Sequence, residues 1–276
     1  MAAAVLLATS LAAQPRAKRP LTAADVDSIA ILLMLEDARK YDEAELGRIL
    51  KSTHPEVRRR AVQSIGRIAD KAGAALIDVA RADKDVEVAA TAAWAAGQLR
   101  DPAAISWLAE LLTGGSTAPT VAREAAIALG KIQVPESRAT LGRYLASAPL
   151  TARASIVGEA LLSIGRFPAG GDLAPVLRWT TAKDIEVRWR AAWALFRSRD
   201  AAALTDLLRL SNDPSADVRF WAVRGLIPHP TVDPVPAATR LAQAVRDGDR
   251  RVRTEALRAL ATVSYTHLTL PTILLV

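Results

Sequence analysis

Residues 184–196 read DIEVRWRAAWALF. Within this stretch the residues Val187, Ala191, Ala194 and Leu195 are apolar. If Val187 is taken as position 0, they lie at positions 0, +4, +7 and +8. An α-helix brings these positions onto one face, because it completes a turn every 3.6 residues. The stretch therefore predicts an amphipathic helix with one buried stripe.

The same pattern recurs along the chain, at residues 54–68, 85–99, 118–132, 153–167, 215–227 and 249–261. The residues at position 0 of these copies are Val57, Val88, Val121, Ile156, Val218 and Val252, and successive copies are 31 to 35 residues apart. Such a constant period indicates tandem repeats. Alanine at +4 is expected to let a neighbouring helix approach closely. Glycine at +9 is expected to mark the helix end, where a left-handed backbone favours it, in Gly66, Gly97, Gly130 and Gly165.

A second helix is predicted before each copy. Examples are residues 74–80, 103–112, 138–146, 173–179, 201–210 and 237–245, and short loops of Asp, Pro and Gly separate the helices. A single hairpin of this size cannot bury its own apolar face, but stacking on both neighbours buries it. The sequence therefore predicts an all-α fold. It is a right-handed α-solenoid of about seven helix–turn–helix repeats that spans residues 22–262.

The segment before the first copy predicts an N-terminal capping helix. Thr22 and Asp25 have the spacing of a capping box. The helix would carry an apolar face, with charged residues around it, formed by Val26, Ile29, Ala30, Leu33 and Met34. A terminal repeat needs a polar outer face for solubility, and this helix is expected to provide one.

The pattern D-x-x-V-R-x-x-A-x-x-A-L-G resembles the short HEAT-like repeat, the kind also found in phycobilin lyases. The resemblance covers roughly residues 22–262 and implies an α-solenoid. It also implies a ladder of Asp at −3 and Arg at +1 between neighbouring repeats. Asp184 and Arg188 form a complete set, Asp85 lacks the Arg, and Arg58 lacks the Asp. The third and fourth copies lack both, so the ladder is expected to be broken in the middle of the array. No catalytic motif of the lyases is matched.

The composition narrows the class of protein. The chain has no cysteine, so it forms neither disulfides nor thiolate metal sites, and 51% of its residues are apolar, which argues against disorder. The net charge is +7, with 36 basic and 29 acidic residues. The densest basic runs, 58–60 and 250–253, have acidic neighbours, which is typical of solvated helical faces with ion pairs. Nucleic-acid binding is the least favoured alternative.

Residues with catalytic, cofactor-binding or metal-binding patterns are not found in the sequence. His54 stands at a predicted helix start, where a capping role is expected, and His229 lies between two prolines. The acidic residues Asp42, Glu43 and Glu45 are interpreted as the first turn of a helix, which favours negative charge. No site residues are therefore assigned to catalysis, a cofactor or a metal.

A candidate binding surface follows from the repeat geometry. In a HEAT-like solenoid the second helices line the concave side, and positions +2 and +6 lie off the buried stripe. The middle of this column is apolar and aromatic, which suggests a site for a protein or peptide partner. The candidate residues are Trp94, Ile127, Trp189, Trp193, Phe220 and Arg224. The alternative is that the tryptophans pack on neighbouring helices.

The two ends of the chain differ from the repeats. Residues 1–13 read MAAAVLLATSLAA, which is typical of the apolar region of a signal peptide, although no basic residue precedes it. This segment predicts export to the periplasm or the cell exterior, with residues 14–21 as a linker. A cytoplasmic location is the alternative. Residues 263–276 read VSYTHLTLPTILLV, without alanine or charge, and are interpreted as foreign sequence from a sequencing adapter.

The leading hypothesis is a protein-binding scaffold that holds its partner on the concave face. The repeats behind a signal-like start also resemble the N-terminal arrays of bacterial exported proteins that carry a cyclophilin-type peptidyl-prolyl isomerase domain farther along. That resemblance implies an alternative, in which the chain is the scaffold part of a truncated isomerase. The sequence makes no prediction of oligomeric state.

Overall fold

The computed structural model describes residues 19–227 and 233–266. The structure does not describe the predicted signal peptide (1–13), residues 14–18 of the linker or residues 267–276 of the tail. His229 and His267 also lie outside the described residues. The first four residues of the tail, 263–266, have a helical backbone. No helix in the described residues is long and apolar enough to cross a membrane.

The described residues form helices and no strand. The second helices of the repeats are α3 (Pro55–Ile68), α5 (Val86–Leu99), α7 (Pro119–Ile132), α9 (Ala154–Ile164), α11 (Ile185–Ser198), α13 (Ala216–Gly225) and α15 (Arg250–Thr266). The first helices are α2 (Glu43–Leu50), α4 (Ala74–Ala80), α6 (Ile105–Thr113), α8 (Pro135–Ser147), α10 (Ala174–Leu177), α12 (Leu204–Leu210) and α14 (Val235–Ala244). Helix α1 (Ala23–Asp37) precedes them, and short 3-10 turns flank α4, α6, α10 and α12 at η1 (Lys71–Gly73), η2 (Pro102–Ala104), η3 (Arg178–Thr181) and η4 (Ala201–Ala203).

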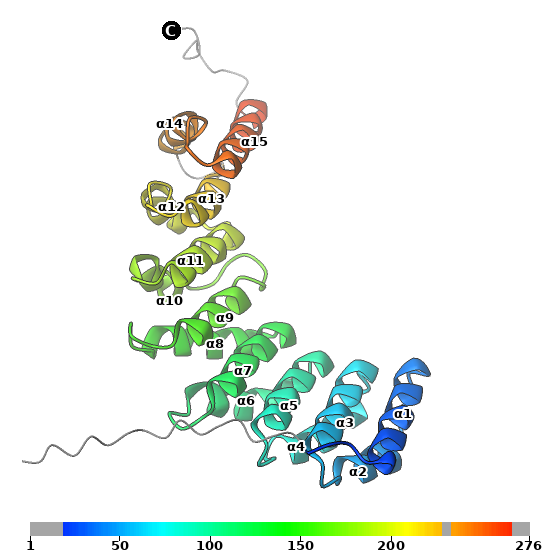
Figure 1. The fold of residues 1–276 in the computed structure, drawn as a ribbon. Coiled ribbons are helices and arrows are strands. Elements are labelled where there is room, and N and C mark those ends of the chain that lie inside the picture. The colour runs from blue at the N-terminus through cyan, green and yellow to red at the C-terminus, as the bar shows by residue number, and fades with distance from the viewer. Residues whose placement is uncertain (1–18, 228–232, 267–276) are drawn as a thin grey trace, which may run out of the picture.

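The helix pairs stack side by side into an elongated arc (Figure 1). The second helices line the inner side of this arc and the first helices line its outer side. Within the described residues there are seven pairs, so the prediction of an all-α solenoid with about seven repeats and an N-terminal helix is confirmed. Helix α9 ends three residues before the predicted boundary, because the chain tightens into i→i+3 turns at Arg166 and Phe167.

Alanine at +4 has the predicted steric role. All seven side chains at this position are completely buried: Ala61, Ala92, Ala125, Ala160, Ala191, Ala222 and Ala256. These helices pack closely against the second helices beside them, and the small methyl group fits the tight spacing. The close stacking of the inner helices therefore depends on a residue that recurs in every repeat.

The prediction that glycine at +9 marks the helix end is wrong for three of the four glycines, because Gly66, Gly97 and Gly130 lie inside their helices. Gly165 does end α9 as its C-cap, but with a φ of −71° and not in the left-handed conformation. A Cβ atom at Gly97 would lie 2.8 Å from the Cα atom of Ala128 in the next repeat, and one at Gly130 would lie 2.5 Å from the Cβ atom of Ser163. The glycines are thus required by the close approach of α3, α5, α7, α9 and α11. The left-handed residues come three positions later, at Ala69, Arg100, Gln133 and Arg199.

Substituting Ala69 by glycine is expected to stabilise the protein by about 0.5–1 kcal/mol. Ala69 is exposed and ends α3 with a φ of 59°, a conformation in which the Cβ atom clashes with the backbone. Urea unfolding measures the effect. Ala38→Gly is the matched control, because Ala38 ends α1 with a φ of −76° and gains nothing from glycine. A loss of stability in both variants would contradict the prediction.

An ion-pair ladder joins neighbouring repeats, but its acidic residue is not the predicted one. Arginine at +1 pairs with an aspartate five residues before position 0 of the next repeat. The pairs are Arg58–Asp83, Arg188–Asp213 and Arg219–Asp247, with Nε–carboxylate distances of 2.6, 2.9 and 2.8 Å. The aspartates at −3, such as Asp85 and Asp184, instead accept hydrogen bonds from backbone N–H groups as N-caps of α5 and α11.

The ladder is interrupted in the middle of the array, as predicted. Position +1 is Ala89 in α5, Ala122 in α7 and Val157 in α9, so the second, third and fourth copies have no guanidinium to offer. In the described residues the rungs therefore join the first two repeats and the last three. Between α5 and α11 the inner helices stack without a rung of this ladder.

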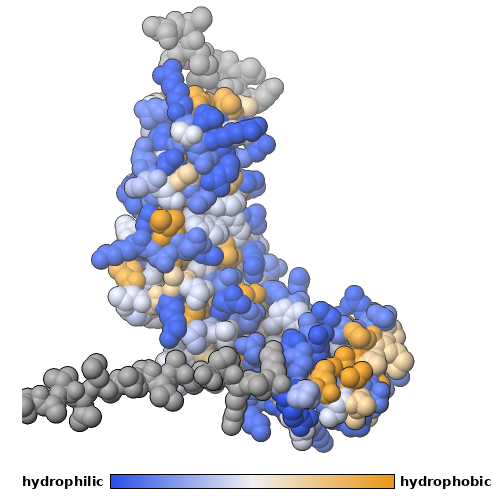
Figure 2. Space-filling model, in the orientation of Figure 1, coloured by the Kyte–Doolittle hydropathy of each residue, from blue (hydrophilic) through white to orange (hydrophobic). Residues whose placement is uncertain are grey.

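The N-terminal helix is capped as predicted, but its outer face is not polar. Thr22 and Asp25 form the capping box, with reciprocal hydrogen bonds of 3.2 and 2.9 Å. Of the predicted apolar face, Val26, Leu33 and Met34 point outward and are about half exposed or more, and Figure 2 shows hydrophobic surface over α1. Leu32 and Leu35 are buried against the array, and Ile29 of the predicted face packs against the core together with Ile31. The expectation of a polar outer face is therefore wrong, because stacking on α3 uses a different stripe of the helix.

Candidate partner-binding surface

The six candidate residues lie on second helices, on the inner side of the arc. Trp94 is on α5, Ile127 on α7, Trp189 and Trp193 on α11, and Phe220 and Arg224 on α13. All six side chains are half-buried. The structure brings the last four together and leaves Trp94 and Ile127 in the N-terminal half.

Five aromatic side chains of α11 and α13 form a group that we call the Trp221 cluster: Trp189, Trp193, Phe196, Phe220 and Trp221. The Trp221 ring is at its centre. Its centroid lies 6.5 Å from Trp189 and 6.0 Å from Phe196 in stacked arrangements. It lies 6.5 Å from Trp193 and 4.9 Å from Phe220 in edge-to-face arrangements. These geometries are the favourable ones for aromatic pairs, so the rings hold one another in place.

Two residues of the Trp221 cluster, Phe196 and Trp221, were not among the predicted site residues. Phe196 occupies +9, where the first four copies have glycine, and glycine appears instead at +7 of the next repeat as Gly225. A Cβ atom at Gly225 would lie 3.3 Å from the Cα atom of Phe196. The close approach of α11 and α13 thus uses a glycine on α13 in place of one on α11, so position +9 of α11 can hold an aromatic ring. The sequence shows this change of glycine position, and it coincides with the aromatic cluster.

Three arginines lie against the faces of these rings. The guanidinium of Arg190 is 4.5 Å from the Trp189 centroid, and that of Arg251 is 5.9 Å from the Phe220 centroid. Arg224 lies 5.2 Å from Phe196 and 5.5 Å from Trp221. The side chains of Arg224 and Arg251 are 42% and 56% exposed. The cluster is therefore an aromatic surface edged by three cations, of which Arg224 and Arg251 are open to solvent and Arg190, 20% exposed, is paired with Glu186.

The tryptophans also pack on neighbouring helices, so the alternative interpretation is partly right. A Cβ atom at Gly165 would lie 2.4 Å from the Trp193 ring, and one at Gly66 would lie 2.5 Å from the Trp94 ring. Each ring thus covers a glycine of the preceding repeat and leaves its remaining surface partly exposed. The indole N–H of Trp189 donates to Glu186 at 3.0 Å.

A shallow polar hollow surrounds Trp94 in the N-terminal half. It is lined by Arg59, Gln63, Glu87, Ala90, Thr91, Trp94 and Glu124. When the Gln98 amide is oriented so that its oxygen faces both donors, this oxygen accepts from the Trp94 indole N–H at 3.0 Å and from Lys131 at 2.9 Å. Burial lowers the pKa of Lys131. Hydrogen bonding from Arg59 lowers the pKa of Glu56 to about 2, although burial opposes it. The charges of this region are largely paired with one another.

The basic runs are neutralised in the same way. Arg59 and Arg60 both pair with Glu56, and Arg251 pairs with Asp217 and Asp249. The pairing supports the interpretation of these runs as solvated helical faces with ion pairs. Because carboxylates lie between the arginines, the two runs do not form a continuous cationic ridge.

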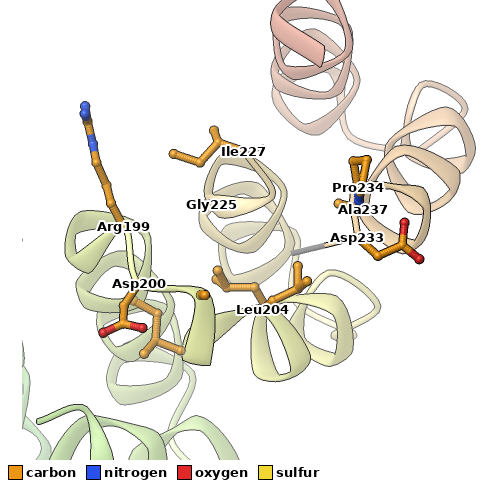
Figure 3. Close-up of a pocket in the computed structure, with 11 residues that line it drawn as sticks. Arg199, Asp200, Leu204, Gly225, Ile227, Asp233, Pro234 and Ala237 are labelled. Atoms are coloured by element: carbon orange, nitrogen blue, oxygen red, sulfur yellow. The ribbon is translucent and has the colours of Figure 1, made fainter. Parts of the chain in front are cut away.

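A cavity of about 230 Å³ lies between the ends of α11, α12 and α13. Figure 3 shows that Arg199, Asp200 and Asp233 at its edge point in different directions. The two carboxylates accept hydrogen bonds of 2.9 Å from backbone N–H groups at helix starts. The cavity therefore does not bring polar groups together on one point.

The remaining sequence interpretations concern helix starts. His54 caps α3, because its Nδ1 accepts from the N–H of Glu56 at 3.2 Å, which leaves Nε2–H to donate to the Arg19 carbonyl at 2.8 Å. Asp42 caps α2, with Glu43 and Glu45 in its first turn. In residues 19–227 and 233–266, no group of three or more acidic or histidine side chains is arranged to hold a metal ion.

Comparison with known proteins agrees with this geometry. The family model of HEAT repeats matches residues 43–117, 73–161 and 158–227. The chain therefore belongs to the HEAT repeat family. None of the curated proteins matches it.

Several solved structures are similar to this fold. The Escherichia coli protein YibA shares 12% identity over 89% of this chain and 99% of its own, with a TM-score of 0.55. An engineered protein shares 21% identity over 88% of this chain and 76% of its own, also with a TM-score of 0.55. A chain in the complex of CpcE and CpcF of phycocyanin lyase from a Nostoc species shares 15% identity over 92% of this chain and 99% of its own, with a TM-score of 0.43. At these identities the likeness concerns the fold alone.

Proposed function

We propose that this HEAT-repeat protein is a scaffold that binds a protein or peptide partner on its inner face, with the Trp221 cluster as the centre of the contact. The observation that carries the proposal is the group of five half-buried aromatic rings edged by Arg190, Arg224 and Arg251. HEAT-type arrays are suited to such a role, because stacked repeats create an extended concave surface.

The energetics of the cluster favour binding. Covering exposed aromatic surface releases water, and tryptophan and arginine are enriched among the residues that contribute most to protein interfaces. Stacking around Trp221 already restricts the rings, so less conformational entropy is lost when a partner orders them. The guanidinium of Arg224 is 42% exposed, and its Nε lies 3.8 Å from a Glu255 carboxylate oxygen, beyond hydrogen-bond distance. It can therefore still donate to a carbonyl or carboxylate of the partner.

Peptides selected from a random displayed library on the immobilised protein provide the test. We expect the selected peptides to lose about 2 kcal/mol of binding free energy, roughly 30-fold in affinity, with the Trp189→Ala/Phe220→Ala variant. Fluorescence anisotropy measures the affinity, and urea unfolding verifies that the variant is folded. Val79→Ala is the control, because Val79 is 68% exposed on α4 of the outer side. Equal losses in the two variants, or no loss in the first, would refute the proposal.

We also propose that the scaffold acts after export, and the support is the apolar segment at residues 1–13. N-terminal sequencing of the protein recovered from a periplasmic fraction tests this location. The isomerase alternative rests on the sequence resemblance alone. Nucleic-acid binding has less support, because the basic runs are paired with carboxylates.

A further inference from the structure

Five basic side chains near the C-terminal ends of the inner helices pair with no carboxylate of the described part of the chain. Four of them are exposed and one, Lys131, is half-buried. The first repeat differs, because its Arg67 pairs with Glu36 at 2.8 Å. We call the five unpaired residues the basic row: Arg100 at the end of α5, Lys131 on α7, Arg166 after α9, and Arg197 and Arg199 at the end of α11.

Backbone contacts show that the row crosses adjacent helix ends. The Nε of Arg197 donates to the carbonyl of Gly165 at 3.2 Å, which joins the end of α11 to that of α9. The side-chain amide of Gln133 donates to the carbonyl of Arg166 at 3.3 Å, which joins the end of α7 to that of α9. These helices follow one another on the inner side of the arc (Figure 1), so the cations form a line across them.

The surroundings of Lys131 show that its neighbours in the row are close enough to interact with it. Its ammonium group donates to the uncharged Gln98 amide, when that amide is oriented with its oxygen toward it. Burial lowers the pKa of Lys131, and Glu124 opposes this, but the positive charges of Arg166 and Arg100 lower it further. The row therefore concentrates positive charge on the surface over α5, α7 and α9.

The acidic residues nearest to the row do not neutralise it. Asp101 and Asp200 accept hydrogen bonds of 3.0 and 2.9 Å from backbone N–H groups at helix starts, and Figure 3 shows Arg199 extending away from Asp200. Glu124 and Glu159 stand seven residues before the row residue of the same repeat, roughly 10 Å along the helix axis. Carboxylates that pair with the row therefore have to come from another molecule.

An apolar stripe runs beside the basic row. Position +6 of α7, α9 and α11 is Ile127, Leu162 and Trp193, and all three are half-buried. Lys131 and Arg197 come four residues after Ile127 and Trp193, so they share a helix face with them. Through Trp193 the stripe reaches the Trp221 cluster. The inner surface thus offers a line of cations next to a line of apolar side chains.

We propose that the basic row binds an extended acidic segment of a protein partner, with a carboxylate at about every third residue. Neighbouring helices are roughly 8–10 Å apart, and a chain in the polyproline II conformation advances about 9 Å in three residues. Such a segment brings one carboxylate to each helix, and its other residues cover the apolar stripe. The proposal rests on the proposed function and deepens it, because it adds the chemistry of the partner on the same inner face.

A nucleic acid fits this surface less well. Phosphates of one DNA strand advance only about 3.4 Å each, so cations roughly 8–10 Å apart would leave most of them unpaired. A phosphate backbone also has no apolar groups to cover Ile127 and Leu162, which are half-buried beside the row. An acidic peptide satisfies both features of the surface.

A synthetic peptide of four Glu-Pro-Val triplets is the probe, because proline favours the polyproline II conformation. Fluorescence anisotropy of the labelled peptide measures its affinity at about 20 and about 150 mM salt, since screening weakens exposed ion pairs. We expect it to bind at least about tenfold more tightly than a peptide with glutamine in place of each glutamate. A peptide of the same composition with its four glutamates adjacent should also bind more weakly.

Variants of the protein separate charge from folding. Arg100→Gly/Arg199→Gly removes two cations at left-handed positions, with φ of 52° and 50°, where glycine is favoured, so the fold should lose no stability. This variant should bind the glutamate peptide roughly five- to tenfold more weakly. Arg48→Gln/Arg81→Gln is the control, because it removes the same charge from the outer helices α2 and α4. Its affinity should stay within about twofold of the unsubstituted protein.

Several results would overturn the proposal. Undetectable binding of the glutamate peptide, equal affinity for the glutamine peptide or for adjacent glutamates, or equal losses in the two variants would each do so. Tighter binding of an oligothymidine of similar length at the higher salt would do so in favour of nucleic acid. Peptides selected from the library that lack acidic residues and depend on Trp189 and Phe220 would refute the acidic partner and still uphold the proposed function.

Discussion

Asp213→Ala is expected to lower the free energy of unfolding by about 3–5 kcal/mol. The side chains of Asp213 and Arg188 are only 9% and 16% exposed, and two hydrogen bonds join them. Removing the carboxylate leaves a guanidinium in a poorly hydrated site with two unpaired N–H groups. It also removes the acceptor for the backbone N–H of Ser215 at the start of α13, at 2.8 Å. Urea unfolding followed by circular dichroism measures the loss.

Two controls separate this effect from the loss of any ion pair. Asp78→Ala removes the partner of Arg81 in an exposed pair, and should cost under about 1 kcal/mol. The double variant Arg188→Leu/Asp213→Ala should recover part of the stability, because an apolar side chain tolerates burial without a partner. The explanation would be wrong if Asp213→Ala cost no more than Asp78→Ala.

The same rungs make stability depend on acid. Hydrogen bonding from Arg219 holds the pKa of Asp247 below its usual value of 3.8, although burial opposes this. A carboxyl whose pKa is lower in the folded state binds protons more readily when unfolded. Its contribution to stability is therefore present above pH of about 4 and is lost as the pH falls through the lower folded pKa. Acid unfolding of the Arg219→Leu/Asp247→Leu variant, in which this contribution is absent, should be less steep than that of the unsubstituted protein.

Gly97→Ala is expected to destabilise the protein by about 2 kcal/mol, although alanine favours a helix by about 1 kcal/mol over glycine. The added Cβ atom would lie 2.8 Å from the Cα atom and 3.0 Å from the Cβ atom of Ala128. The nearest of these atoms belongs to the backbone, so the clash can be relieved only by moving α7 away from α5. That movement would open the contact between the buried alanines of the two helices, such as Ala96 and Ala128.

The matched control has the opposite sign. A Cβ atom at Gly142, in the interior of α8, would meet only Pro175 at 3.8 Å, which is an ordinary contact. Gly142→Ala should therefore stabilise by about 1 kcal/mol through helix propensity. Ala128→Gly should rescue Gly97→Ala in part, because it returns the space on the opposite helix. Equal effects of Gly97→Ala and Gly142→Ala in urea unfolding would show that the close approach has no energetic weight.

The helices and their order could be predicted from local pattern. The spacing of Val187, Ala191, Ala194 and Leu195 defines a buried stripe. The same spacing locates the first six second helices within three residues of their observed bounds, whereas α15 ends five residues after its predicted end. The predicted capping residues Thr22 and His54 also act within one turn of their own helix. Such features depend on residues close in sequence, so one chain is enough to identify them.

The candidate site was only partly predictable. The +2 and +6 positions identified Trp189, Trp193, Phe220 and Arg224, which the structure does bring together. The same two positions also identified Trp94 and Ile127. Trp94 lies three repeats before α11, and Ile127 lies two repeats before it. Trp221, the centre of the cluster, lies at +3 and was missed. Whether an off-stripe ring meets another depends on the helix beside it, and the pattern of one helix does not contain that information.

The sequence by itself determined the all-α repeat fold, the inner position of the second helices and the steric role of alanine at +4. Only the tertiary structure decided that the ladder aspartate stands five residues before position 0, that glycine at +9 accommodates a neighbouring helix, and that Val26, Leu33 and Met34 face outward. The reason is physical. Periodicity shows which side of a helix is apolar, whereas the residues opposite that side depend on how far and at what angle successive repeats are displaced, and this follows from packing across the whole interface.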